Sequence, residues 1–243
     1  MSGRRWSWLW LGGLLAIALA PAGLLTATLA GQCAAQCRFA EVEGYWWRGA
    51  ADIYLQSGRP DRGWRGLGRL RWQARWFGLH LTLGSGRADL AGDWSGLQLA
   101  IDHLRLPAGS LFAHIGHGLP QDGWGGDLTA GATRLTIPWN FSTASGQGEI
   151  VWRQAQTSLL ENFPLGEFRL AWTLPVDGHG QGRLKGDAQP VAVDGEVALN
   201  PFHFNGQVQL APAAAPLKKY LDLIGQPAGE NAYRITLPRP SSG

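Results

Sequence analysis

The sequence predicts a mainly β protein: a single N-terminal transmembrane helix followed by a twisted or curved antiparallel β-sheet domain with two short helices. Glycine supplies 35 of the 243 residues, which disfavours a helical fold because each glycine weakens a helix interior by about 1 kcal/mol relative to alanine. Thirteen tryptophans provide apolar surface that a disordered chain lacks. Beyond residue 38, apolar and polar residues alternate repeatedly after glycines, which is the period-two pattern of half-buried strands.

The first thirty residues are the most apolar part of the chain. From Trp6 to Leu29 there are 24 residues without a charge, and a bilayer core needs about 20. A secretory signal peptide has an apolar stretch of only about 7–15 residues, so we expect an uncleaved anchor in residues 1–30, with cleavage after Ala30 as the alternative. The residues expected in this anchor are Trp6, Trp8, Trp10, Leu14, Leu15, Leu24 and Leu25.

The basic residues around the anchor predict its orientation. Arg4 and Arg5 precede the apolar segment, and the first basic residue after it is Arg38. Because basic residues are retained on the cytoplasmic side, the N-terminus is predicted to be cytoplasmic and the rest of the chain to lie across the membrane.

A short linker with both cysteines follows the anchor. Residues 31–40 are predicted to be juxtamembrane and contain Cys33 and Cys37, and residues 41–243 are predicted to be the β domain. In an oxidising compartment a local disulfide would close a very short loop and add little stability. Free thiols and an intermolecular bond remain alternatives.

The segment from Gly68 to Trp76 illustrates the predicted sheet. Leu70, Trp72, Ala74 and Trp76 alternate with three arginines and Gln73, so the first set should be buried on one face of the sheet and the second should be wet. Short helices are predicted in residues 106–116 and 212–224 from glycine and proline stop signals and, in the second, from helical spacing of apolar residues. They would cover the ends of the sheet, and the stretch 121–132 is where a hinge between two halves is expected.

The polar residues predict no catalytic, metal or cofactor site, so we do not expect an enzyme. His114 and His117 are the only close histidine pair, and no third ligand accompanies them in the sequence. Glu41 and Glu43 share a face of an extended segment, where carboxylates are usually solvated. The net charge is +3 with scattered arginines, which argues against nucleic-acid binding.

Several segments, in order, resemble a known family. They are Gly44-Tyr-Trp-Trp47-Arg-Gly49-Ala-Ala, Leu67-Gly68-Arg-Leu70-Arg-Trp72, Leu106-Pro107-Ala108, Gly148-Glu-Ile-Val-Trp152-Arg, Phe163-Pro164-Leu165-Gly166 and the closing stretch from Leu221 through Gly225 and Pro227 to Tyr233. Together with the preceding anchor, they resemble the type II secretion system protein N family, also called general secretion pathway protein N. Tyr45-Trp46 and the cysteine pair depart from the pattern of that family.

The resemblance implies a non-enzymatic accessory subunit of the bacterial type II secretion system. Such a subunit is bitopic in the inner membrane, has its main domain in the periplasm, and contributes to export of folded proteins across the outer membrane. Its partners would be other secretion subunits in the inner membrane and periplasm, and membrane lipid would be met through the anchor. The candidate contact surface is formed by the aromatic faces around Trp46, Trp47, Trp72 and Trp76, or by an exposed sheet edge that accepts a partner strand. Each ring could instead belong to the core, which is the more common place for it.

Two other classes of function share the same strand pattern. A membrane-anchored β-groove handling lipid or another amphiphile would present an open apolar trough instead of a packed interior. A carbohydrate-binding module would use exposed tryptophans to contact cell-wall glycans.

Overall fold

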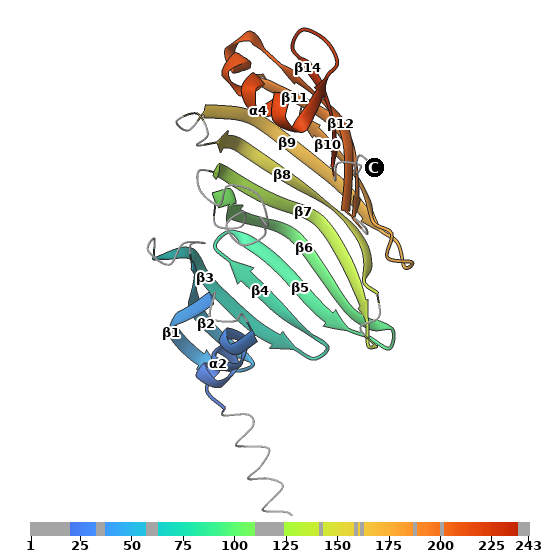
Figure 1. Ribbon diagram of the computed structural model, residues 1–243. Helices are drawn as coiled ribbons and strands as arrows, with labels where there is room; N and C mark the ends of the chain where they lie inside the picture. The colour runs from blue at the N-terminus through green and yellow to red at the C-terminus, as the bar shows by residue number, and fades with distance from the viewer. Residues whose placement is uncertain are drawn as a thin grey trace, which may run out of the picture. The chain divides into compact units, whose positions relative to one another are not determined.

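The predicted fold class is confirmed for the sheet. The computed structural model (Figure 1) describes residues 20–32, 37–56, 63–109, 124–140, 143–157, 160, 163–186, 189–199 and 202–237. These residues form a 14-stranded sheet in which hydrogen-bonded neighbours follow chain order up to β12, which pairs with β14, and β14 pairs with β13. The pairings described are antiparallel. The chain divides into two compact units, residues 1–87 and 88–243.

The N-terminal unit consists of one helix and the first strands. They are α2 (Ala22–Gln32), β1 (Cys37–Tyr45), β2 (Arg48–Gln56), β3 (Trp64–Arg75), β4 (Gly78–Leu83) and the start of β5 (Gly86–Gly92). The sheet thus begins at Cys37, inside the range predicted as a linker.

The C-terminal unit contains the rest of β5, the remaining strands and a helical segment. Its further elements are β6 (Gly96–Pro107), β7 (Trp124–Pro138), β8 (Ser145–Thr157), β9 (Phe163–Leu174), β10 (Gln181–Gly186), β11 (Val191–Leu199), β12 (Phe202–Leu210), η3 (Pro212–Leu217), α4 (Lys218–Ile224), β13 (Gly225–Pro227) and β14 (Ala232–Leu237). Residues 124–132, expected to contain a hinge, belong to strand β7, and the two units divide within β5 instead.

The helix predicted over residues 212–224 is present, and it has two parts. A 3-10 turn, η3, comes first and contains Pro216, which has no N–H to donate; the α-helix α4 follows. The other predicted helix, over residues 106–116, falls largely outside the described residues.

Part of the predicted anchor is helical. Among the residues that the structure describes, no helix has the length and apolar character needed to cross a membrane. Leu24 and Leu25 lie in α2, whereas Trp6, Trp8, Trp10, Leu14 and Leu15 lie outside the described residues. Helix α2 starts directly after Pro21 and buries Ala22 and Thr26. The Thr26 hydroxyl donates to the backbone carbonyl oxygens of Ala22 and Gly23, at 3.3 and 3.2 Å.

The interior of the N-terminal unit is small. Its buried cluster consists of Ala22 from α2, Ala51 from β2 and Trp72 from β3, with half-buried apolar side chains packed around them. Trp72 is 4% exposed. The buried face predicted for β3 is therefore confirmed at Trp72, and Leu70 packs half-buried against the same cluster, but Trp76 is exposed. Helix α2 contributes Ala22 to the cover.

The interior of the C-terminal unit is larger. The buried side chains in its cluster are Ala155, Phe168, Val191, Val193, Phe204, Val208, Leu210, Ala214, Leu217, Tyr233 and Ile235. Ala214 and Leu217 come from η3, so this segment packs on the apolar face of the last strands. Tyr233 is 1% exposed, and its hydroxyl donates a 2.8 Å hydrogen bond to Asp222. Burial, with the bond to Asp222, raises the pKa of Tyr233 above its ordinary value.

Glycines inside the strands make room for aromatic rings on neighbouring strands. A Cβ added to Gly49 would come within 2.5 Å of the Trp72 ring, and one added to Gly186 within 2.5 Å of the Phe168 ring. Gly195 and Gly206 face each other, and a Cβ on either would come within 2.7 Å of the Phe204 ring. The sequence pattern suggested that glycines separate the strands. These glycines instead lie within strands, where the absence of a Cβ leaves room for an aromatic ring.

Candidate interaction surfaces

The four tryptophans predicted as a contact surface separate into two groups. Trp46, Trp47 and Trp76 are 41, 38 and 97% exposed, whereas Trp72 is buried. The Trp72 indole N–H lies 3.1 Å from the backbone carbonyl oxygens of both Tyr45 and Trp46. Trp72 therefore holds the β1–β2 turn in place from the core and is not part of an exposed surface.

The exposed members lie in two adjacent turns of the N-terminal unit. Strand β2 pairs with β3 through Arg48 and Gln73, and the backbone N–H of Ala74 donates to the carbonyl oxygen of Trp47 at 2.5 Å. The β1–β2 turn therefore lies beside the end of β3, where the β3–β4 turn begins. We call the five aromatic residues of these turns the aromatic tip: Tyr45, Trp46, Trp47, Trp76 and Phe77.

Side chains of the aromatic tip are well exposed for their size. Phe77 is 82% and Tyr45 42% exposed. The rings of Tyr45 and Trp47 stack with centroids 5.8 Å apart and planes 3° apart. Such an arrangement presents a broad apolar surface, whereas singly scattered apolar side chains are ordinary on a soluble protein.

A further exposed tryptophan lies in the β5–β6 turn of the C-terminal unit. Trp94 is 94% exposed. The carboxylate of Asp93 accepts hydrogen bonds from the backbone N–H groups of Ser95 and Gly96, at 2.7 and 3.1 Å, and the indole of Trp139 donates to the Asp93 carbonyl at 2.8 Å. These bonds fix the turn. The hydrogen bond from the Ser95 hydroxyl, followed by those from the backbone N–H groups of Ser95 and Gly96, lowers the pKa of Asp93.

Phe77 and Trp94 are exposed aromatic residues that were not among the candidates predicted from the sequence. Phe77 directly follows Trp76, and both stand between Arg75 and Gly78, which are paired across the turn. Trp94 similarly stands between Asp93 and Ser95. An aromatic residue placed where the alternation stops, one or two positions before a strand-starting glycine, is the pattern that could have indicated both.

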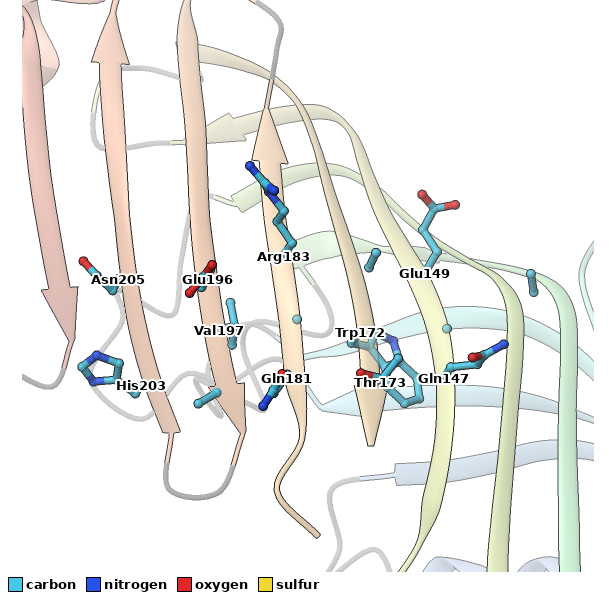
Figure 2. Close-up of a pocket in the computed structure, with 15 residues that line it drawn as sticks. Gln147, Glu149, Trp172, Thr173, Gln181, Arg183, Glu196, Val197, His203 and Asn205 are labelled. Carbon is cyan, nitrogen blue, oxygen red and sulfur yellow. The ribbon is translucent and has the colours of Figure 1, made fainter. Parts of the chain in front are cut away.

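The C-terminal unit also has a hollow of about 850 Å³ on the face of its sheet opposite the core (Figure 2). Cross-strand pairing aligns two rows of lining residues. One row is Glu149, Ala171, Arg183, Glu196 and Asn205, and the other is Gln147, Thr173, Gln181, Ala198 and His203. Figure 2 shows these side chains spread over neighbouring strands instead of converging on one point. Such a surface suits hydrogen bonding to an extended polar partner.

Ion pairs cover the same face. Arg183 donates from Nε and Nη2 to the two carboxylate oxygens of Asp194, at 3.0 and 2.9 Å, and these hydrogen bonds lower the pKa of Asp194. Arg169 pairs with Glu149 at 3.1 Å. Because all four side chains are well exposed, each pair contributes little to stability.

Glu41 and Glu43, considered earlier as a carboxylate pair, share one arginine. Arg69 lies 3.4 Å from Glu41, 2.8 Å from Glu43 and 3.7 Å from Asp52. The hydrogen bond to Glu43 is the main cause that raises the pKa of Arg69. These carboxylates are partners of a structural ion-pair network at a β-bulge between Ala40 and Glu43.

The remaining candidates are only partly described. Cys37 is buried and is not a free thiol, but Cys33, His114 and His117 lie outside the described residues, so the Cys33–Cys37 pairing stays a prediction. Within the described ranges, no group of three histidine, cysteine, aspartate or glutamate side chains could hold a metal ion.

The fold and these surfaces define an antiparallel sheet protein. Its apolar face is covered in part by its own helices, and its polar face is accessible. The sequence matches the family described as type II secretion system (T2SS), protein N, over residues 35–236. The chain therefore belongs to the type II secretion system protein N family and is a component of that system, associated with its other components. No curated protein and no solved structure gives a significant match.

Proposed function

We propose that the chain is a non-enzymatic accessory subunit of the type II secretion system, which contributes to export of folded proteins across the outer membrane. The family match carries this proposal, because it extends from just before β1 into the last strand, β14. The whole described sheet therefore corresponds to the family, and the proposal does not depend on one short motif.

The proposed location is the bacterial inner membrane, with a single span, a cytoplasmic N-terminus and the main domain in the periplasm. The uncharged segment that begins at Trp6, preceded by Arg4 and Arg5, supports this topology through the retention of basic residues on the cytoplasmic side.

Contact with other subunits is the proposed mode of action. The polar rows of the C-terminal unit provide amide, hydroxyl and charged groups along β8 to β12, which can bond to the backbone and polar side chains of an extended protein segment. On the apolar face, buried side chains of β8, β9, β11 and β12 belong to one cluster with Ala214 and Leu217 of η3. Both observations favour a scaffold with a packed interior over an open apolar trough.

Deletion in the source bacterium tests the proposal. Proteins normally secreted to the medium should accumulate in the periplasm, and the full chain supplied in trans should restore secretion. Unchanged secretion in the deletion strain would count against the role in export.

Topology is tested separately with alkaline phosphatase fused after residue 237. The enzyme folds to its active form only after export, so an active fusion that stays with the inner membrane after alkaline washing is expected. An inactive fusion, or its release by the wash, would contradict the proposed location.

The amphiphile-groove alternative has its own test. Eight of the side chains that line the hollow in Figure 2 are polar, three of them from Glu149, Arg183 and Glu196, and covering such groups with acyl chains is unfavourable. Mass spectrometry of the purified chain should therefore show no stoichiometric lipid after exchange into a lipid-free detergent, and a retained lipid would favour the groove.

A further inference from the structure

We propose that the aromatic tip of the N-terminal unit lies in the headgroup layer of the membrane, with Trp76 and Phe77 in direct contact with lipid. The inference rests on the proposed function, because it requires the apolar N-terminal segment to be in the membrane. It adds that the folded unit touches the bilayer with a defined surface.

The place where the apolar segment joins the fold is the first observation. The carbonyl oxygen of Ala20 accepts a 3.2 Å hydrogen bond from the backbone N–H of Trp46, and Pro21 forms a bridge with Tyr45. The uncharged residues that begin at Trp6 run directly into Ala20. The part of the apolar segment that precedes the fold, residues 6–20, therefore ends at the aromatic tip, and most of the uncharged sequence that follows it lies in α2.

The position of Trp76 and Phe77 relative to that junction is the second observation. Trp46 and Trp47 are consecutive, and Trp47 is hydrogen-bonded to Ala74, two residues before Trp76. Ala20, the β1–β2 turn and the β3–β4 turn thus form a continuous series of neighbours. A membrane that holds the segment before Ala20 must lie close to all of them.

The chemistry of the two turns is the third observation. Tryptophan is enriched at membrane interfaces, where its apolar ring and polar N–H meet both environments. Exposed Arg48 and Arg75 adjoin the aromatic residues, and residues 44–49 and 73–79 contain no acidic residue. Arginines can hold their apolar stems against the rings while their charge reaches anionic lipid headgroups.

The opposite end of β4 provides the internal contrast. The turn there is Gly84-Ser85, which is exposed and has no aromatic residue. Because β4 is antiparallel to β3, this turn lies at the other end of the strand from Trp76 and Phe77. Ser85 is therefore a matched control position in the same unit.

Tryptophan quenching tests the contact. The full chain is reconstituted in vesicles of phosphatidylethanolamine and phosphatidylglycerol, with and without bromine on the acyl chains. The emission of Trp76 is the difference between wild type and Trp76→Phe, and we expect bromine near the headgroup end to remove most of it. Emission added by Ser85→Trp should be unaffected. Equal emission of Trp76 in brominated and plain vesicles would overturn the inference.

Photo-crosslinking gives a second readout that keeps the aromatic character of the site. A benzophenone amino acid replaces Phe77 or, as the control, Ser85 in the full chain in the same vesicles. Lipid adducts at position 77 and none at position 85 are expected. Adducts at position 77 only with another protein copy would instead assign the tip to a protein interface and overturn the inference.

Vesicle flotation separates this inference from the proposed location. If the wild-type chain floats with the vesicles but Trp76 is not quenched and position 77 gives no lipid adduct, the tip proposal fails and the anchor stands. If the wild-type chain does not float, both fail.

Discussion

The two compact units differ in how much of their stability rests on a single side chain. In the described part of the N-terminal unit, the buried cluster holds one large side chain, Trp72, and two alanines. The described cluster of the C-terminal unit holds eleven buried residues from strands β8 to β14 and from η3. Both units are built from alternating strands, so the difference comes from what covers the apolar face.

The cover comes from different parts of the chain. In the C-terminal unit, η3 follows β12 directly and packs Ala214 and Leu217 on the strands. In the N-terminal unit, Ala22 of α2 belongs to the cluster, and α2 is connected to the apolar N-terminal segment. The small interior of the N-terminal unit is therefore covered in part by the helix that follows the apolar N-terminal sequence, whereas the interior of the C-terminal unit includes its own helical segment η3.

Trp72→Ala should destabilise the N-terminal unit most strongly. It removes the one large buried ring of the described N-terminal cluster and its hydrogen bonds to the β1–β2 turn, so we expect a loss of about 3–5 kcal/mol from the free energy of unfolding. Limited proteolysis with mass spectrometry should show new cleavage in residues 37–83 while residues 163–237 stay protected.

Trp76→Ala is the control for that change, because Trp76 is 97% exposed on the same segment. Its effect in detergent should stay within about 0.5 kcal/mol. Equal protease resistance of both variants would contradict the central role of Trp72.

Tyr233→Ala should destabilise the C-terminal unit without unfolding it, because many buried neighbours remain. The cavity should cost about 3–5 kcal/mol. Tyr233→Phe keeps the ring and loses only the hydrogen bond to Asp222, which should cost about 1–3 kcal/mol. Chemical denaturation of the full chain in detergent measures both, and equal midpoints for the two variants would show that the ring contributes little.

Gly195→Ala tests the contact between glycine and ring. The new Cβ would come within 2.6 Å of Phe204, so the ring must shift, at a cost of about 1–3 kcal/mol. Gly131→Ala is the matched control, since its nearest neighbour would be an oxygen at 3.8 Å. Similar thermal midpoints for the two variants would refute the close approach.

Asp194→Asn should have the smallest effect, and the effect should depend on pH. Arg183 lowers the pKa of Asp194 in the folded chain. The pair therefore stabilises the fold fully above the pKa of an unfolded aspartate, which is about 4. This stabilisation is lost as the pH falls through the lower pKa of Asp194 in the folded chain. Thermal midpoints of wild type and variant should differ slightly near neutral pH and converge in acid. A constant difference down to low pH would contradict the assignment.

The sequence predicted the strands well because alternation is a local property. Strand β3 buries Trp72 and exposes Arg71 and Arg75 as expected, whereas Trp76 lies beyond the end of the strand and is exposed. Residues 212–224 form the expected helical segment. The residue at which the fold begins, and the helix that covers the apolar face of the first strands, were harder to predict. Ala22 and Thr26 belong to a sequence as apolar as a membrane span, and only the strands beside them show that α2 buries these side chains.

The candidate surface was predicted only in part, for a similar reason. Trp72 and Trp76 occupy equivalent positions in the alternation of β3, yet one is buried and the other exposed because the strand ends at Arg75. The polar hollow depends on the register of strands far apart in sequence, such as the alignment of Glu149 with Asn205 through the intervening strands. No local pattern contains that information.

The pairing of glycines with rings also constrains how this chain can vary over time. A larger residue at Gly49 or Gly206 would collide with Trp72 or Phe204, while a smaller residue in place of the ring would uncover the glycine backbone. Substitutions at such contacting sites are energetically coupled. In related sequences we therefore expect correlated substitution, in which a glycine and the aromatic ring that it contacts are replaced together.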